Sequence, residues 1–533
     1  MNSNLDKIDH IVVLMLENRS FDNMLGWLGA KGGRKQKVNG VAGKKLSNPI
    51  PLYAERPKGR KTIPVGKSHE MTNPSPDPGE AYFHVNTQLY GLVNPQENRN
   101  EPFNRKPYNL PKNGKLPRTA PMNGFVTDFI NAFNGLQHRQ PTFDEYKIIM
   151  ECFDEDDVPV ISKLAKEYAV FDAWHCSVPS QTFCNRSFVH SATSNGAVTN
   201  APFYHWLLHD SQTIYNRIED KGDPKITWKV YYDKLDAVSV TGLLNPTLWK
   251  YHDGNFKYME DFEDDAANGT LPSYSFIEPR VFLDHSDQHP PADVEAFGTS
   301  SVLAGELLIN RIYQAVRNGR NWEHTLLIIT YDEHGGCYDH VPPPAAIPPD
   351  PDAPTGQYDF KFDRLGVRVP TIMISAYIKR GTVVSDVYDH TSIIRTVCKR
   401  WDLEPLTERD RHANSFEKAL NAQKARTDFP IIKPRPYETP ENVREEPIND
   451  LQKTILYFAA GFDDAVQIER KGNLLEKAED LFQLVQDEGR IAHIKNTGQA
   501  IEFMNAFADR RTTHFPLSVF LKRLSKKIKS IFK

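Results

Sequence analysis

Two adjacent carboxylates, Asp332 and Glu333, directly follow the mostly apolar run 325–330 and precede two histidines, His334 and His340. A run of this kind is typical of a strand that is buried on both faces of a parallel sheet. In open α/β sheets, ligands bind beside the carboxyl ends of such strands. The segment therefore predicts half of a metal site. The alternative interpretation is a polar loop that only caps a strand.

A second pair of potential metal ligands, Glu17 and Asn18, follows the mostly apolar run 8–16. We expect this run to be another buried, parallel strand, so its carboxyl end should lie at the same edge of the sheet. Carboxylate and amide oxygens are ligands that hard divalent cations prefer. The alternative is a surface turn in which Ser20 or Asp22 caps a helix.

A possible nucleophile lies in the turn 177–187, which brings hydroxyl groups, an amide and an arginine to the start of a predicted helix. A helix N-terminus favours anions and lowers the cost of ionising a hydroxyl group. A hydroxyl beside a cation with oxygen ligands is the arrangement that phosphoryl transfer needs. Thr182 fits this position, although a threonine here could also be only a helix cap.

Histidines for phosphate binding or proton transfer occur at two further places. The loop 284–291 follows the predicted strand 273–280 and contains two aspartates and two histidines, one of which is His289. His390 lies where another helix is predicted to begin. We expect the loop to contribute to a site, because a single surface histidine would not explain its density of acids and imidazoles.

The composition is that of an ordinary soluble globular protein of 533 residues, with 39% hydrophobic and 25% charged residues. A net charge of −4 and a pI near 6.5 argue against a nucleic-acid-binding protein. No stretch reaches the 18 or so apolar residues that a membrane span needs. Five scattered cysteines favour a reducing compartment over a disulfide framework. The segment 366–375 is predicted as an edge or short crossing strand.

The chain divides by composition into a large domain with all the motifs above, 1–425, a Pro-rich linker, 426–447, and a charged helical extension, 448–515. Within the first part, residues 30–120 form a loop-rich insertion with a basic first half. The last segment, 516–533, places its apolar residues on one helical face and only basic charges on the other. This pattern predicts a helix on an anionic membrane surface, and the alternative is a helix docked on the protein's own body.

The N-terminus runs directly into a predicted strand and lacks a charged n-region, an apolar h-region and a small-residue cleavage site. We therefore expect no signal peptide. This favours either a cytoplasmic protein or export by a specialised, non-classical route, with peripheral membrane association through the C-terminal segment.

Five of these motifs, in this order, resemble the phosphoesterase family of bacterial phosphatidylcholine-preferring phospholipases C, plant non-specific phospholipases C and a related acid phosphatase. That family belongs to the alkaline-phosphatase-like superfamily. The resemblance implies a three-layer α/β sandwich with a mostly parallel central sheet. The motifs are Glu17 to Asp22, Pro179 to Arg186, Asp287 to Pro290, Asp332 to Gly336, and Asp389 to Ser392.

The resemblance also implies one divalent metal ion, which would be Ca²⁺, Zn²⁺ or Mg²⁺. Its ligands would be Glu17, Asn18, Thr182, Asp332 and Glu333. Thr182 would attack phosphorus and form a phosphothreonine that water then hydrolyses. Further expected catalytic residues are His289, His340 and His390, and expected substrate-binding residues are Glu80, Asn185, Arg186 and His334.

The sequence departs from the family pattern at two places. Ser180 and Gln181 replace Gly-Pro before the nucleophile, and Cys184 replaces a proline after it. Many members have Asp-x-x-His where this chain has Asp77 to Glu80, so Glu80 or His84 would have to substitute for a phosphate-contacting histidine.

Three functions follow as hypotheses. The first is a phospholipase C that cleaves glycerophospholipids to diacylglycerol and a phosphorylated headgroup. The second is an acid phosphatase that acts on soluble phosphomonoesters. The third is a catalytically weakened module that only binds phospholipid, which the altered turn and Glu80 would explain.

Overall fold

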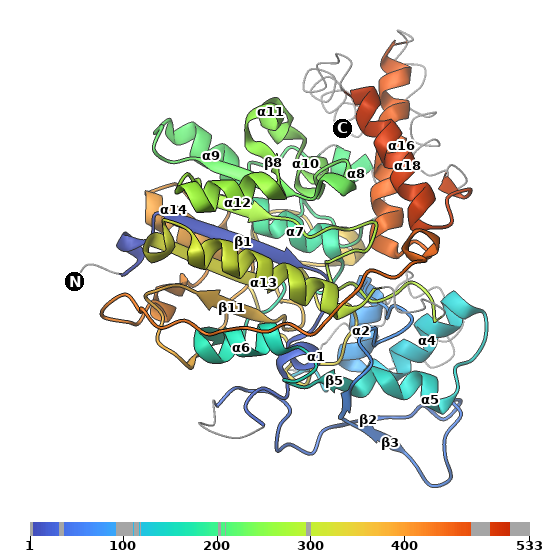
Figure 1. Ribbon diagram of the computed structural model, residues 1–533. Helices are drawn as coiled ribbons and strands as arrows, with labels where there is room; N and C mark the ends of the chain where they lie inside the picture. Colours follow the sequence, from blue (N-terminus) through green and yellow to red (C-terminus); the bar gives the residue numbers. More distant parts are fainter. Residues whose placement is uncertain are drawn as a thin grey trace.

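The computed structural model describes residues 4–30, 37–91, 110, 117, 119–200, 204–207, 209–294, 300–470 and 491–511. Its centre is an eight-stranded sheet (Figure 1). Seven of these strands run parallel and one runs against them. The predicted α/β architecture with a mostly parallel central sheet is confirmed. The strand order is β12 (Thr382–Val384), β6 (Ala169–Phe171), β11 (Thr371–Ile374), β10 (Thr325–Tyr331), β1 (His10–Leu16), β9 (Tyr274–Ile277), β7 (Trp228–Tyr232) and β8 (Phe256–Tyr258).

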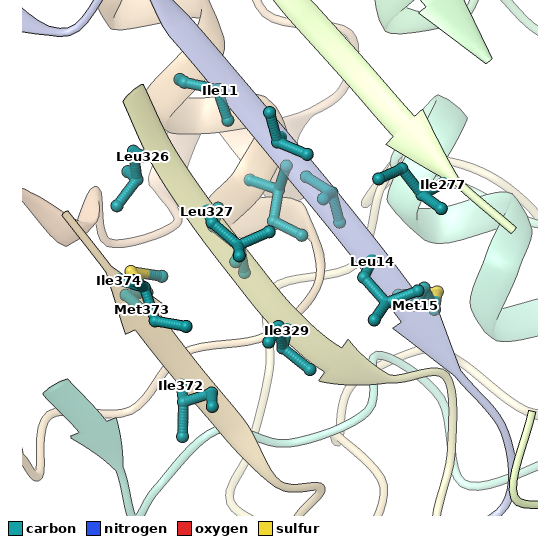
Figure 2. Packing of buried hydrophobic residues seen from close by; sticks show 14 of the residues in the cluster. Ile11, Leu14, Met15, Ile277, Leu326, Leu327, Ile329, Ile372, Met373 and Ile374 are labelled. Atoms are coloured by element: carbon teal, nitrogen blue, oxygen red, sulfur yellow. The ribbon is translucent and has the colours of Figure 1, made fainter. Parts of the chain in front are cut away.

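The two strands predicted from apolar runs, β1 and β10, are neighbours at the centre of the sheet. They pair in parallel from His10 with Thr325 to Leu16 with Tyr331. Figure 2 shows their buried aliphatic side chains packed beside those of β9 and β11. Because burial on both faces favours unbroken apolar sequence, these strands lack the polar alternation of a half-exposed strand.

Helices cover both faces of the sheet. On one face α6 (Pro159–Glu167), α13 (Val302–Asn318) and α12 (Met259–Asn268) lie side by side (Figure 1). The alternation of side chains along β7 separates the faces. Tyr231 contacts Phe262 of α12, whereas Trp228 contacts Tyr215 of α9 (Ile214–Lys221). Near α9, α7 (Thr182–Ser191) and α14 (Thr391–Trp401) pack against each other.

Of the two alternatives predicted for 366–375, an edge strand or a short crossing strand, the edge strand is wrong. β11 lies inside the sheet and pairs antiparallel with both β10 and β6. Its four residues are all buried. A short apolar run has no feature that distinguishes an interior strand from an edge strand, so the sequence could not place it.

The described residues within 37–153 form a smaller lobe with a hydrophobic cluster that includes Val85, Phe125 and Tyr146. The lobe brings the loop before α2 to the carboxyl ends of the central strands, as described below. Its elements, in chain order after α1 (Phe21–Leu25), are β2 (Ser47–Pro49), β3 (Thr62–Pro64), β4 (Gly66–Ser68), α2 (Tyr82–Tyr90), α4 (Phe125–Gln137), α5 (Phe143–Tyr146) and β5 (Glu151–Phe153).

The C-terminal helices α16 (Asp450–Arg470) and α18 (Thr497–Arg511) pack against each other (Figure 1). They share a hydrophobic cluster with Phe183 of α7 and Leu243 of α10 (Val240–Leu244). The other short helices are α8 (Tyr204–Leu207), α11 (His252–Asn255) and α15 (Glu408–His412). The proposed domain boundaries at residues 425 and 447 stay predictions, and the basic segment 516–533 lies outside the described residues.

None of the described helices is both long enough and apolar enough to cross a bilayer. All five cysteines are buried and unpaired.

Candidate active site

The register between β1 and β10 places the two predicted ligand pairs side by side. The Asp332 amide donates to the Leu16 carbonyl oxygen at 3.0 Å, which continues the sheet pairing by one residue. The backbone amide of Asn18 then donates to Asp332 Oδ1 at 3.1 Å. Two strands that end together therefore fix Glu17 and Asn18 against Asp332 and Glu333.

The close approach of these two turns depends on Gly335. A Cβ atom at this position would lie 2.2 Å from the Asn18 carbonyl oxygen, and the backbone φ of Gly335 is +59°. Only glycine combines this space with this backbone conformation without strain. Asn18 itself has a φ of 54°, a left-handed conformation that asparagine tolerates better than most residues.

Thr182, the first residue of α7, is buried beside Glu17. Its hydroxyl donates to Glu17 Oε2 at 3.2 Å. The Arg186 guanidinium, one helical turn later, donates to Glu17 Oε1 at 2.8 Å through Nε and also through Nη2. Arg186 thus fixes one oxygen of Glu17, which leaves the other oxygen for Thr182.

Three buried oxygen atoms in this cluster have no hydrogen-bond partner among the described residues. They are Asn18 Oδ1, Asp332 Oδ2 and Glu333 Oε1. Buried polar atoms are rarely left unpaired in proteins, because desolvation is costly. Carboxylate and amide oxygens are the ligands of a hard divalent cation, so this donor set fits the expected metal ion.

The buried charges of the cluster also favour a bound cation. Burial raises the pKa of the Glu17 carboxyl well above its usual range, although the Arg186 charge opposes the shift. Burial and the neighbouring Asp332 charge likewise raise the pKa of Glu333. A cation between them would favour the ionised forms of both carboxyls.

The side chains of Glu80 and His289 both contact the side-chain amide of Asn18. Asn18 Nδ2 donates to Glu80 Oε2 and lies 3.0 Å from His289 Nε2. The side-chain amide of Gln181, the residue before Thr182, donates to Glu80 Oε1 at 3.2 Å. Glu80 therefore occupies a position in contact with the cluster, as the comparison with the family's Asp-x-x-His motif suggested.

Two of the expected site residues, His390 and His334, lie against Asp332 and Glu333, respectively. His390 Nε2 donates to the Asp332 carbonyl oxygen at 2.6 Å, and its Nδ1 accepts from Trp174 Nε1 at 3.3 Å. Both ring nitrogens of His390 thus have partners, and a catalytic role for this residue stays a prediction. His334 Nε2 donates to Gln88 Oε1 at 2.7 Å, and burial lowers the pKa of His334 to about 4.

His340 belongs to a different cluster. Its Nδ1 donates to Asp22 Oδ2 at 2.5 Å, and its Nε2 lies 2.6 Å from the Lys44 ammonium. The hydrogen bonds of this ring within the described residues lead away from Thr182. The structure therefore does not bring His340 together with the other expected catalytic residues.

The expected substrate-binding residue Asn185 shapes the turn before Thr182. Its Oδ1 accepts from the Val178 amide at 3.0 Å, and its Nδ2 donates to the Ser180 carbonyl oxygen at 2.8 Å. These hydrogen bonds hold the turn in place although Ser180 and Gln181 replace the family's Gly-Pro. Substrate binding by Asn185 and Arg186 stays a prediction.

Sequence reasoning missed two residues that contact or approach this cluster, Asp77 and Gln181. The ligand atoms of Asp77, Glu80 and His289 all lie within 4.8 Å of one another. Asp77 could have been found from the sequence, because Asp77 to Glu80 aligns with the family's Asp-x-x-His motif. No signal in the sequence predicts the contact between Gln181 and Glu80, because their separation is about a hundred residues.

These features define a phosphoryl-transfer type of site at the carboxyl edge of an α/β sheet. The Phosphoesterase family matches residues 8–404, and the chain belongs to that family. Non-specific phospholipase C6 of Arabidopsis thaliana is 35% identical over 472 residues, which cover 85% of this chain and 80% of the relative. Phospholipase C B of Mycobacterium tuberculosis is 28% identical and covers 87% of this chain and 88% of the relative.

Among solved structures, a protein of the alkaline phosphatase superfamily from Vibrio parahaemolyticus overlaps with 48% of this chain and 64% of its own. The TM-score is 0.30 and the sequence identity is 11%. The family and the sequence relatives are sufficient to identify the chain as a phosphoric ester hydrolase.

Proposed function

We propose that the chain is a metal-dependent phospholipase C, which hydrolyses glycerophospholipids to diacylglycerol and a phosphorylated headgroup. The observation that carries the proposal is the Thr182 hydroxyl at the start of α7, bonded to Glu17 Oε2 at 3.2 Å beside unpaired oxygens of Asn18, Asp332 and Glu333. The names of the sequence relatives support the choice of a phospholipid substrate.

In the proposed first step, Thr182 Oγ1 bonds to phosphorus as the bond from phosphorus to the diacylglycerol oxygen breaks. The Thr182 proton passes to Glu17 Oε2, because this oxygen already accepts the hydroxyl hydrogen bond. The departing oxygen takes up a proton from water. The hydroxide left by that water then attacks phosphorus and cleaves the phosphothreonine, the headgroup phosphate is released, and Thr182 Oγ1 takes its proton back from Glu17.

Three features of the chain assist this step. The N-terminal end of α7 lowers the cost of charge on Thr182 Oγ1. Arg186 orients Glu17, and His390 holds the backbone of Asp332. A divalent cation held by Glu17, Asn18, Thr182, Asp332 and Glu333 would neutralise phosphate charge and lower the pKa of the hydroxyl.

The test is turnover of phosphatidylcholine vesicles by Thr182→Ala, with release of diacylglycerol and phosphocholine as the readout. We expect a loss of at least about a thousandfold, because no second hydroxyl takes the place of the nucleophile. Ser180→Ala is the matched control, because this neighbouring hydroxyl instead donates to the Val198 carbonyl oxygen. Full activity of Thr182→Ala with an unchanged fold would overturn the mechanism. Turnover of p-nitrophenyl phosphate but not of vesicles would instead favour a phosphatase.

We also propose that the basic amphipathic segment 516–533 holds the enzyme at anionic membrane surfaces. Deletion of this segment should reduce sedimentation with phosphatidylserine vesicles and leave turnover of a soluble ester unchanged. Equal vesicle binding by both forms would contradict the proposal. Whether the enzyme acts in the cytoplasm or after non-classical export stays a prediction.

A further inference from the structure

His285 lies in the loop after β9, shortly before His289, and both of its ring nitrogens face hydrogen-bond acceptors. Nδ1 lies 2.5 Å from Asp287 Oδ1, and Nε2 lies 2.7 Å from Ser300 Oγ. The Ser300 hydroxyl gives its own proton to Glu446 Oε1, so it accepts the proton of His285 Nε2. Both ring nitrogens therefore donate, and the ring of His285 is an imidazolium.

The surroundings of the ring favour this charge. The side chains of His285, Asp287 and Glu446 are all buried. Burial alone would lower the pKa of His285, but the charges of Asp287 and Glu446 raise it well above its usual range. Glu446, from the segment before α16, is itself held in place, because its carbonyl oxygen accepts from the Thr497 amide at 2.9 Å. The imidazolium is thus fixed between two carboxylates from distant parts of the chain.

Asp287 connects this imidazolium to two residues of the candidate active site. Its Oδ1 also accepts from the His289 amide at 2.9 Å, and its carbonyl oxygen accepts from the Glu17 amide at 2.9 Å. His289 Nε2 in turn lies 3.0 Å from Asn18 Nδ2. A shift of Asp287 would therefore move an expected catalytic histidine relative to the expected metal ligands.

The backbone between Asp287 and His289 needs such an anchor. Gln288 has a φ of 70°, in the left-handed region that residues other than glycine rarely adopt. Residues in this conformation persist only where the surrounding structure holds them. The hydrogen bond from the His289 amide to Asp287 spans Gln288, and His285 fixes the carboxylate that accepts this bond.

We propose that His285 is a positioning residue for His289, and that Glu446 holds the His285 ring in place. One oxygen, Asp287 Oδ1, accepts from both His285 Nδ1 and the His289 amide, so the imidazolium sets where that oxygen lies. The inference rests on the proposed function, because His289 is expected to act on the phospholipid. It also goes beyond that function, since neither His285 nor Glu446 lies in the five family motifs.

The alternative is that the imidazolium only stabilises the fold. The two interpretations differ in which atom of His285 matters. A positioning role requires the donor at Nδ1, whereas a purely stabilising role depends on the charge and volume of the whole ring. Asparagine places an amide donor near the position of Nδ1, and glutamine places one near the position of Nε2. The two amides can therefore separate the interpretations.

The experiment is steady-state turnover of phosphatidylcholine vesicles by the full-length variants His285→Asn and His285→Gln. Both remove the positive charge and supply one amide donor, so they form a matched pair. We expect kcat of His285→Gln to fall about tenfold or more with KM within about twofold, and kcat of His285→Asn to stay within about threefold of the wild type. Equal losses, or a larger loss in His285→Asn, would overturn the proposal.

The same substitution in a His289→Gln background tests the route of the effect. Residues that act through one another have non-additive effects, so His285→Gln should cost less than about twofold there. The control is His209→Gln, which replaces another buried histidine and should change kcat by the same factor in both backgrounds. An undiminished tenfold loss from His285→Gln in the His289→Gln background would refute the role of His285.

Hydrogen exchange of the wild type keeps the proposal testable if the variants fail to fold. The His289 amide donates to a buried carboxylate, so the segment 286–291 should exchange about as slowly as β1. Exchange as fast as that of an open loop would overturn the proposal. A wild-type protein that exchanges slowly here but does not turn over vesicles would contradict the proposed function and not the anchoring of His289.

Discussion

Two clusters in this molecule have the same composition, two carboxylates and a histidine, and they differ in what neutralises them. Asp22, Asp339 and His340 meet beside α1, and Asp77, Glu80 and His289 meet beside the proposed nucleophile. The first cluster contains the fully buried Arg368, which donates to both of its carboxylates. The second contains no such guanidinium bond among the described residues.

Hydrogen bonds of Arg368 account for all five of its N–H donors. Nε and Nη2 donate to Asp22 and Asp339, and Nη1 donates to the carbonyl oxygens of Asn39 and Asp172, at 2.9 and 2.7 Å. The cluster is therefore a closed ion-pair network that ties the 335–341 turn to α1. Ligand types and proximity alone do not define a cation site, because an arginine can take the place of the ion.

The largest effect should come from Arg368→Met, which removes the guanidinium and leaves two buried carboxylates unpaired. Breaking a buried ion pair from one side typically costs about 3–5 kcal/mol. We expect a large fall in the temperature of thermal unfolding, measured by circular dichroism.

The control for Arg368 is Arg311→Gln, which removes a half-exposed pair with Glu263. Exposed ion pairs contribute roughly 0–1 kcal/mol, so this variant should unfold close to the wild type. Equal unfolding temperatures for the two variants would show that the Arg368 network is not a stabilising centre.

The two histidines of these clusters provide the next contrast, in activity. His289→Gln should reduce phospholipid turnover by about a hundredfold or more, because a group in contact with Asn18 and the acidic cluster is lost. His340→Gln should reduce kcat by no more than a few-fold, since its ring bonds to Asp22 and Lys44. Steady-state kinetics on vesicles measures both losses. If the two variants lose the same activity, His340 takes part in the reaction.

Removal of metal ions by a chelator should lower the unfolding temperature through the cluster of Glu17, Asn18, Asp332 and Glu333, and not through the Arg368 cluster. A cation present at a hundred times its dissociation constant stabilises the folded state by about 2.7 kcal/mol, which EDTA would remove. Burial raises the pKa of the Glu17 and Glu333 carboxyls above their unfolded values. In the cation-free protein these groups therefore contribute stability below the unfolded pKa, near 4, and lose it as the pH rises through the folded pKa.

The effect of EDTA on the unfolding temperature should accordingly be larger at pH 8 than at pH 5. An effect that is the same at both values would mean that these carboxyls are not the cation ligands.

Much of the catalytic edge could be predicted because it depends on local patterns. Apolar runs identified β1 and β10, and their parallel pairing then required Glu17 and Asn18 to meet Asp332 and Glu333. Strand order and direction could not be obtained in this way, because pairing partners depend on the whole chain. β11 illustrates the limit, since its sequence is equally compatible with an edge and an interior position.

The histidines show where residue type stops being informative. His340 follows Asp332 by only eight residues, yet the glycine turn between them leads it to Asp22. His390 lies near Asp332, but its ring donates to a backbone oxygen and accepts from Trp174. Which nitrogen faces which partner is decided by packing, and a single sequence contains no local signal for it.

The smallest effect should come from Lys44→Ala at the rim of the Arg368 cluster. The Lys44 ammonium contacts Asn39 and His340, and partial burial lowers its pKa. Because Arg368 already neutralises the carboxylates beneath, loss of Lys44 should change the free energy of unfolding by less than about 1 kcal/mol. Urea titration of both forms at low and high salt checks this. A loss comparable with that of Arg368→Met would mean that the rim lysine, and not the buried arginine, balances Asp22 and Asp339.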